Sequence, residues 1–402
     1  MVGDSVSAYV KELDDRYVLP TYRRQPLEIV GAEGTEVVGS DGRRYLDFVN
    51  GLSVSNFGHC HPAVVEAVRE QVGRLIHCSN LYYTAPQAEV ARRLSQMAGG
   101  GRVFFGNSGA EANEAAIKIA RKHGRDKGKM VVVTLEGSFH GRTMATLSAT
   151  GQPDKMIDFA PALQTFRHVA IDDEAALTDA FRKGDVAALL LEPVAGESGV
   201  QLISESFLRF GQSLCRDTGA LFMVDEVQTG LGRCGAAFAY QRFGLEPDVI
   251  TVAKSLAGGL PIGAVIARNE AEGVLGLGDH GSTFGGGPVV AAAALAVLNL
   301  IAADGLFETV ETLGARLESW LHELTLAGAA GDVRRLGLMA AVDLNSKDAH
   351  AVVDAARAEG ILLNATSSDT LRMLPALIVS EEEIDRVGRF LIRYVVEESE
   401  KS

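Results

Sequence analysis

Two residues that could do chemistry together end two short apolar segments near the middle of the chain. Asp225 follows the apolar run 221–224, and Lys254 follows the run 249–253. Apolar runs of this length, between polar and glycine-rich turns, are typical of strands buried on both faces of a parallel sheet. Ligands bind beyond the carboxyl ends of such strands. We therefore expect the carboxylate and the amine to converge on one crevice.

A carboxylate and an amine in one crevice fit the chemistry of pyridoxal phosphate. The lysine amine condenses with the aldehyde of this cofactor, and the acid keeps the ring nitrogen protonated so that the ring accepts electrons. Taken singly, an aspartate at a strand end is often a cap, and a lysine there is usually solvated. The two residues together, Asp225 and Lys254 at this spacing, favour a cofactor site.

The segment around Ser108 is a candidate phosphate site. Residues 103–105 are strand-like, Ser108 and Glu111 have the spacing of a capping box, and apolar residues then recur with helical periodicity. The N-terminus of a helix offers unpaired N–H groups and a positive dipole end to a phosphate. Alone, this pattern is typical of an ordinary capped helix. Beside the cofactor pair, we interpret it as a phosphate cradle.

The elements that must position these residues belong to an α/β fold. Strand-like segments, among them 131–134 and 187–191, alternate with helical patterns between residues 100 and 270. This alternation predicts a large domain with a mainly parallel sheet. Short strands separated by turns precede residue 50, and helices and short strands alternate again beyond residue 305. We predict a large domain of residues 51–304 and a smaller domain built from residues 1–50 and 305–402.

Charge and cysteine usage narrow the class of protein. The chain has 38 basic and 52 acidic side chains and a net charge of −14, which argues against nucleic acid or an anionic membrane as a partner. Its four cysteines form no CxxC pair and no signal peptide is evident, so we expect free thiols in a reducing cytosol. The apolar segment 289–303 is shorter than the roughly 20 residues of a membrane span and predicts a buried helix.

Two motifs suggest other chemistry and are weaker. His59, Cys60 and His61 are adjacent, so they cannot all face one metal ion, and no second cluster supplies further ligands. We predict a turn there and no metal site. Residues 230–235 fit a dinucleotide fingerprint, but its first glycine does not directly follow the strand and no clear helix comes next. A nicotinamide oxidoreductase is thus a remote alternative.

Taken together, the segments resemble the class III aminotransferases, which have fold type I and depend on pyridoxal phosphate. The resemblance runs almost from end to end and rests on ordered motifs at residues 46–48, 58–62, 79–83, 107–116, 139–143, 225–232, 254–263 and 281–286. The chain departs from the family at Gly287, where the family usually has Asn, so the structure of that loop is not predicted. Within the class, the resemblance is greatest to the acetylornithine aminotransferases. It implies transfer of the terminal amine of N-acetylornithine to 2-oxoglutarate, as in arginine biosynthesis, giving N-acetylglutamate semialdehyde and glutamate.

The resemblance implies roles for the residues around the cofactor ring. Lys254 would bind the cofactor covalently and move a proton between the substrate and cofactor carbons, and Asp225 would pair with the ring nitrogen. Gln228 would lie near the phenolic oxygen. Phe139 would stack on the face of the ring, and His140 beside it would also bind the cofactor.

The phosphate would be shared between two subunits. In the family, amides and the hydroxyl of Ser108, Gly109 and Ala110 bind it, and Thr283 reaches in from a neighbouring subunit. The resemblance therefore implies an obligate homodimer with shared active sites.

Two arginines would select the substrates. Arg142, assisted by Ser282, would clamp the carboxylate that is distant from the reacting amine. Glu197 would mask Arg372 when a monocarboxylate donor binds, and would move aside so that Arg372 takes the α-carboxylate of glutamate or 2-oxoglutarate.

Related activities stay open as alternatives. Other aminotransferases of terminal amines use ornithine, succinylornithine, 4-aminobutyrate or a modified lysine as donor. Aminomutases and decarboxylases of the same fold would not depend on 2-oxoglutarate.

Overall fold

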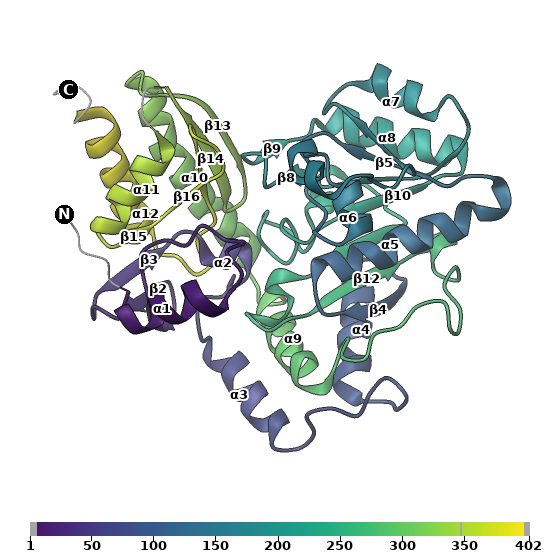
Figure 1. The fold of residues 1–402 in the computed structure, drawn as a ribbon, viewed down its shortest axis with the longest axis horizontal. Helices are drawn as coiled ribbons and strands as arrows, with labels where there is room; N and C mark the ends of the chain where they lie inside the picture. Colours follow the sequence, from purple (N-terminus) through teal and green to yellow (C-terminus); the bar gives the residue numbers. More distant parts are fainter. Residues whose placement is uncertain (1–5, 346–347, 398–402) are drawn as a thin grey trace.

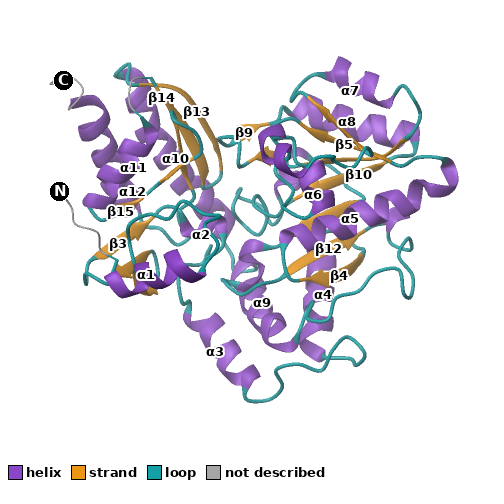
Figure 2. Ribbon diagram, viewed as in Figure 1, coloured by secondary structure: helices purple, strands orange, loops and turns teal. Residues whose placement is uncertain are grey.

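A seven-stranded sheet forms the centre of the larger part of the molecule (Figures 1 and 2). The computed structural model describes residues 6–345 and 348–397. In spatial order the strands are β4 (Arg102–Gly106), β12 (Gly263–Ala267), β11 (Val249–Val252), β10 (Leu221–Asp225), β7 (Val186–Leu191), β5 (Val131–Leu135) and β6 (Phe166–Val169). β12 is antiparallel to both its neighbours, and the other pairings are parallel. The predicted α/β fold with a mainly parallel sheet is therefore confirmed.

Helices cover the sheet, which explains why its central strands are almost wholly apolar. α5 (Gly109–Gly124) packs against β4, β12, β11 and β10, and α8 (Glu205–Thr218) packs against β10 and β7. α4 (Ala85–Met97) lies on β4, and α7 (Glu174–Phe181) lies on β6. Every residue of β7, β10 and β11 is buried. A strand buried on both faces has no polar face, so its pattern is a continuous apolar run.

The strand register brings the chemical residues to one edge of the sheet. Asp225 ends β10 and lies opposite Thr251 of the parallel strand β11. Lys254 follows directly, at the start of a short 3₁₀ helix (Lys254–Ala257). β4 also runs parallel to β11, because β12 is antiparallel to both. The chain therefore leaves β4 at this same edge, where Ser108 begins α5.

The smaller part of the molecule combines both ends of the chain (Figure 1). One four-stranded sheet has the order β1 (Ile29–Glu33), β2 (Glu36–Gly39), β3 (Arg44–Asp47), β15 (Ile361–Leu362). A second has the order β13 (Ala330–Leu336), β14 (Met339–Leu344), β17 (Thr370–Met373), β16 (Asn364–Ala365). The predicted short strands before residue 50 and at 371–374 are confirmed. The domain boundaries at residues 50 and 304 stay a prediction.

Three helices of the C-terminal segment pack beside these sheets: α10 (Leu306–Leu326), α11 (Ala349–Ala358) and α12 (Glu381–Leu391). Asp385 of α12 accepts hydrogen bonds from Arg316 of α10 (Nε, 2.8 Å; Nη2, 2.7 Å) and from the indole Nε1 of Trp320 (2.9 Å). Gly388, one turn further along α12, lies directly against the indole ring. Together these contacts clamp α12 to α10.

The apolar segment 289–303 is a buried helix, as predicted. α9 (Pro288–Ile301) packs against α4, α3 (Pro62–Val72) and the 3₁₀ helix that begins at Lys254. In the part of the chain that the structure describes, no single helix is long and apolar enough to cross a membrane. α9 and α10 together meet that criterion of length and composition, but they are bent by 75° relative to each other.

Arg233 joins the two parts of the molecule. Its buried guanidinium donates to Ser53 Oγ (2.9 Å), Asn56 Oδ1 (2.6 Å) and the carbonyls of Leu338 (2.8 Å) and Pro375 (2.6 Å). These acceptors are neutral, and burial lowers the pKa of Arg233 to about 9. The surrounding residues 230–235 form tight turns followed by a 3₁₀ helix, Ala239–Phe243, so they lack the helix that a dinucleotide fingerprint requires.

The His-Cys-His cluster is a turn, as predicted. His59 Nε2 lies 2.8 Å from Asp47 Oδ2, while His61 Nδ1 accepts from the amide of Ala63 and begins α3. Within residues 6–345 and 348–397, no group of three or more His, Cys, Asp or Glu side chains is arranged to hold a metal ion.

Candidate functional site

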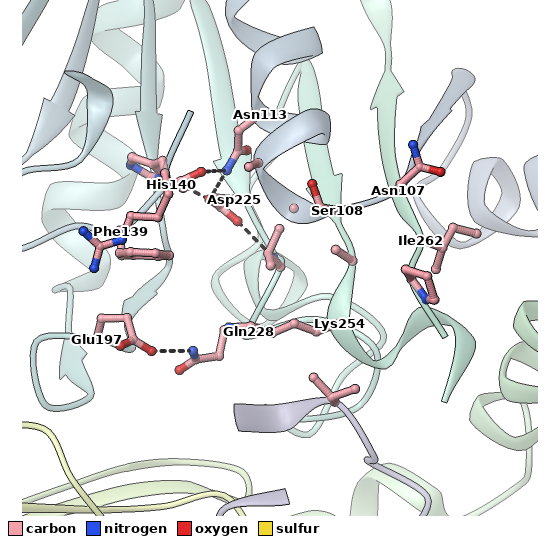
Figure 3. Close-up of a pocket in the computed structure, with 18 of the residues that line it drawn as sticks. Asn107, Ser108, Asn113, Phe139, His140, Glu197, Asp225, Gln228, Lys254 and Ile262 are labelled. Atoms are coloured by element: carbon pink, nitrogen blue, oxygen red, sulfur yellow. Dashed lines mark hydrogen bonds and ion pairs between the residues drawn. The ribbon is translucent and has the colours of Figure 1, made fainter. Parts of the chain in front are cut away.

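A cavity of about 450 Å³ lies at the carboxyl edge of the large sheet (Figure 3). This volume is in the range of small-molecule sites, which measure roughly 300–1,000 Å³. Most of the residues proposed from the sequence line it together: Ser108, Gly109, Ala110, Phe139, His140, Arg142, Glu197, Asp225, Gln228 and Lys254.

Asp225 is fixed at one end of the cavity and is almost fully buried (Figure 3). Its Oδ2 accepts from Asn113 Nδ2 (2.7 Å) and contacts His140 Nδ1 (2.9 Å). Its Oδ1 accepts from the amide of Val227 (3.0 Å). A carboxylate held by donors on both oxygens keeps its orientation. His140 Nε2 is buried and has no hydrogen-bond partner among the described residues.

Lys254 projects its amine into the same cavity. Its backbone is in the left-handed region, with φ of 38°, which is uncommon for a residue with a side chain and occurs at functional sites. No hydrogen bond or ion pair of its amine to the described residues is present. Burial lowers the pKa of Lys254, which favours the neutral amine. A neutral amine without a partner is the form that attacks a carbonyl carbon.

The N-terminus of α5 leaves two amides free at the cavity. Ser108 caps the helix by accepting from the amide of Glu111 (3.1 Å). The reciprocal half of the predicted capping box is wrong, because Glu111 Oε2 accepts from the amide of Asn107 (2.6 Å) instead of that of Ser108. The first amides of a helix have no acceptor in the helix itself, and Gly109 and Ala110, which carry two of them, line the cavity. A Cβ at Gly109 would lie 2.8 Å from Val227 Cγ1, so the close approach requires glycine.

These groups fit a phosphorylated pyridine ring with an aldehyde. The carboxylate of Asp225 suits a ring N–H, the Lys254 amine suits the aldehyde, and the N-terminus of α5 suits the phosphate. The ring of Phe139 lines the same cavity and offers a flat apolar face.

Two site residues were missed by the sequence reasoning. Asn113 is buried in α5, donates to Asp225 and to the carbonyl of His140 (2.8 Å), and accepts from Thr251 (2.7 Å). Glu192 lines the cavity, and its Oε2 accepts from the amide of Phe139 (2.9 Å). Burial raises the pKa of Glu192 to about 7. Each carried a signal: Asn113 is a polar residue on an alanine-rich buried face, and Glu192 ends an apolar strand as Asp225 does.

Arg372 and Glu197 form an ion pair at the edge of the cavity. Arg372 Nη1 donates to Glu197 Oε1 (2.7 Å) and to the carbonyl of Gly196 (2.8 Å), and Nη2 donates to Asn364 Oδ1 (2.8 Å). Gln228 Nε2 also donates to Glu197 Oε1 (3.3 Å). Burial raises the pKa of Glu197, but the Arg372 guanidinium outweighs it and holds that pKa at about 2. Glu197 is therefore ionised and masks a buried guanidinium.

Arg142 also lines the cavity, with its guanidinium carbon 5.4 Å from the centroid of the Phe139 ring. Its guanidinium has no carboxylate partner among the described residues. An unpaired guanidinium at a cavity wall suits a ligand carboxylate.

Ser282 and Thr283 do not line the cavity. Ser282 Oγ accepts from Asn107 Nδ2 (3.2 Å) and lies behind that residue, and no hydrogen bond joins it to Arg142 in the described chain. Thr283 lines a separate small cavity beside Asn80, Gln87 and residues 285–288. The prediction that Thr283 completes a neighbouring subunit's site stays a prediction. Gly287 has φ of −55° and directly precedes α9.

Comparison with known proteins bears on this site. A family model described as class-III aminotransferase matches residues 17–395. The acetylornithine aminotransferase of Caldanaerobacter subterraneus subsp. tengcongensis is 44% identical over 382 residues, which cover 94% of this chain and 97% of the relative. That of Methanothermobacter thermautotrophicus is 44% identical over 384 residues, covering 94% of this chain and 96% of the relative.

Solved structures are similar over the whole fold. The ornithine aminotransferase of Toxoplasma gondii has a TM-score of 0.93 and 32% identity, covering 98% of this chain and 96% of that one. The acetylornithine aminotransferase of Elizabethkingia anophelis has a TM-score of 0.87 and 33% identity, covering 97% and 98%.

Proposed function

The chain belongs to the class-III aminotransferases, and from this we propose that it transfers the terminal amine of N-acetylornithine to 2-oxoglutarate. The products are N-acetylglutamate semialdehyde and glutamate, as in arginine biosynthesis. The observation that carries the proposal is the ion pair of Arg372 with Glu197, at a cavity that the unpaired Arg142 also lines. Arg142 is always available to a ligand, whereas Glu197 can mask Arg372. A site with these two cations suits two substrates that differ by one carboxylate. The names of the similar relatives support the same donor.

Pyridoxal phosphate, on which class-III aminotransferases depend, supplies an electron sink for the carbanion formed when the substrate carbon loses its proton. We propose that Asp225 binds the ring nitrogen as a charged partner, because Asn113 and His140 hold its carboxylate in place. The free amides of Gly109 and Ala110 would bind the phosphate, and Gln228 would lie at the ring's oxygen.

Lys254 has two tasks in the proposal. Its Nζ would hold the cofactor, and as a base it would remove the proton from the substrate carbon that bears the reacting amine. A lowered pKa serves both tasks, since a neutral amine is nucleophile and base alike. Phe139 excludes water from one face of the reacting region.

The two arginines orient the substrates. Arg142 binds the α-carboxylate of N-acetylornithine, which places the terminal amine at Lys254, while Glu197 keeps Arg372 masked. For glutamate, Arg142 holds the side-chain carboxylate and Arg372 takes the α-carboxylate after Glu197 has moved. Ser282 would assist only through Asn107, which lines the cavity.

We propose a homodimer as the working form. Large apolar side chains are exposed in three places: on α1 (Ala8–Tyr17), on the segment 75–83 and at Phe284. None of the residues of α1 is buried. Exposed apolar surface of this extent marks interaction sites. Phe284 adjoins Thr283. A partner subunit that covers this surface would therefore have Thr283 beside the phosphate site of its own cavity. The net charge of −14 and the four free cysteines support a cytosolic enzyme without nucleic-acid or membrane partners.

A panel of amine donors tests the function. Purified enzyme is loaded with cofactor and given 2-oxoglutarate with N-acetylornithine, N-succinylornithine, ornithine, 4-aminobutyrate or a terminally acting lysine derivative, and glutamate is measured. We expect the highest kcat/KM with N-acetylornithine and a loss of nearly all turnover in Lys254→Ala, since both tasks of the amine are removed. A higher kcat/KM with another donor would reject the proposed substrate. Activity without 2-oxoglutarate would reject transamination.

A further inference from the structure

A second cation, besides Arg142, lies at the ring of Phe139, which lines the cavity. Lys155 lies in the turn that follows Gly151, and its Nζ is 5.2 Å from the centroid of the Phe139 ring. The guanidinium carbon of Arg142 is 5.4 Å from the same centroid. Both cations therefore lie at one aromatic ring, and that ring lines the cavity.

The turn that carries Lys155 is tied to the segment that carries Phe139. Gln152 Nε2 donates to the carbonyls of Gly137 and Ser138, each at 3.1 Å. The amide of Gly151 donates to Ser138 Oγ (3.1 Å). The segments that carry Lys155 and Phe139 are thus joined by hydrogen bonds, so the fold sets the position of Lys155 relative to Phe139.

The charge of Lys155 is not neutralised within the chain. Its Nζ donates to the neutral Gln152 Oε1, and within the described residues no carboxylate lies in ion-pair distance of Lys155 or Arg142. Burial and the neighbouring Arg142 both lower the pKa of Lys155, whereas Glu197 raises it. Two cations that repel each other, in a chain where carboxylates outnumber cations by 52 to 38, form a site that an incoming anion stabilises.

We propose that Lys155 is a specificity-determining residue that binds, with Arg142, the distal carboxylate of both amine donor and amine acceptor. The inference rests on the proposed function, in which Arg142 holds that carboxylate. A carboxylate has about four lone-pair sites, and a guanidinium fork occupies two of them. An ammonium group fits the outer sites, and Lys155 supplies one at the same ring. Lys155 would thus favour substrates that carry a carboxylate far from the reacting carbon.

Binding of a dicarboxylate tests the role of the charge. Lys155→Met keeps the apolar stem and removes the charge, and Lys155→Arg keeps the charge. We expect the Kd of glutarate for the cofactor-loaded enzyme, measured by calorimetry, to rise about tenfold in Lys155→Met and to change little in Lys155→Arg. Lys183→Met, the same change at an exposed lysine outside the cavity, is the matched control and should bind like the wild type. An unchanged Kd in Lys155→Met would overturn the proposal.

A pair of donors separates charge recognition from a disturbed turn. N-acetylornithine and N-acetylputrescine present the same terminal amine and differ by the carboxylate. In single turnovers, Lys155→Met should lose about tenfold in rate with N-acetylornithine and little with N-acetylputrescine. Equal losses with both donors would show that Lys155 only supports Phe139 and would overturn the inference. If the wild type does not react with N-acetylornithine, the proposed function fails, and glutarate binding still decides the role of Lys155.

Discussion

In the proposed function, Arg372 serves only one of two substrates, and its contacts suit that role. It is held by the carbonyl of Gly196 and by Asn364 as well as by Glu197. When Glu197 moves away, the two neutral acceptors remain, so the guanidinium keeps its position without its ion-pair partner. Breaking a buried ion pair is usually costly because it leaves a charge unpaired. In the proposed function, the incoming α-carboxylate would replace the departing one.

The first prediction at this scale concerns Glu197→Ala. With Arg372 permanently unmasked, the enzyme should react faster with glutamate and more slowly with N-acetylornithine. A charge-assisted hydrogen bond contributes about 1.5–3 kcal/mol, so the ratio of the two single-turnover rates should shift about ten- to a hundredfold. Single turnovers are the measurement, because steady-state constants combine both half-reactions. Glu174→Ala, at an exposed carboxylate of α7, is the control; an unchanged ratio in Glu197→Ala means that Glu197 is no switch.

At the scale of elements, the clamp between α10 and α12 depends on one ionised carboxylate. Arg316, by its hydrogen bonds, and then Trp320 lower the pKa of Asp385 from 3.8 to about 2. A carboxyl whose pKa is lower in the folded state stabilises the fold above its unfolded pKa. That contribution is lost as the pH falls from about 4 towards 2.

Asp385→Asn should therefore be less stable than the wild type by about 1 kcal/mol at pH 7, after allowance for solvent screening. The difference should shrink steadily below about pH 4. Trp320 is the only tryptophan of the chain, so urea unfolding followed by its fluorescence reports on this clamp. Asp217→Asn, at an exposed carboxylate 3.9 Å from Arg216, should show neither effect. A difference that stays constant from pH 7 to pH 3 would mean that shape, and not charge, makes the contact.

The strands and helices also explain which residues of the site could be predicted from the sequence and which could not. Asp225 and Lys254 were predictable because buried strands leave continuous apolar runs, and residues that end parallel strands meet at one edge. The partners of Asp225 were not, since Asn113 reaches it from a helix 112 residues away in the chain. The position of Lys155 was not predictable for the same reason, because its relation to Phe139 depends on how a loop is anchored. The cap at Ser108 was predictable, but the direction of the Glu111 side chain was not.

For the whole molecule, the decisive prediction is that subunits complete each other's sites. Thr283 lies outside the cavity of its own chain, next to the exposed Phe284. Lys254→Ala subunits are mixed with Thr283→Ala subunits at limiting cofactor concentration. If Thr283 crosses the interface, each mixed dimer has one doubly damaged site and one intact site. Random exchange in a symmetric dimer then restores roughly a quarter of wild-type activity. No recovery after demonstrated exchange would show that Thr283 does not serve the partner.

Arg233 has a consequence for the order in which the ribosome completes this enzyme. Two of its acceptors, Ser53 and Asn56, are synthesised before it, and the other two, Leu338 and Pro375, long after it. While only two of its four acceptors are present, the guanidinium of Arg233 stays hydrated, because burying a cation without its hydrogen-bond partners is costly. The two parts of the molecule therefore close on each other only when the last tenth of the chain has emerged. That same stretch carries Arg372, so the ion pair with Glu197 also forms only when the molecule gains its final shape.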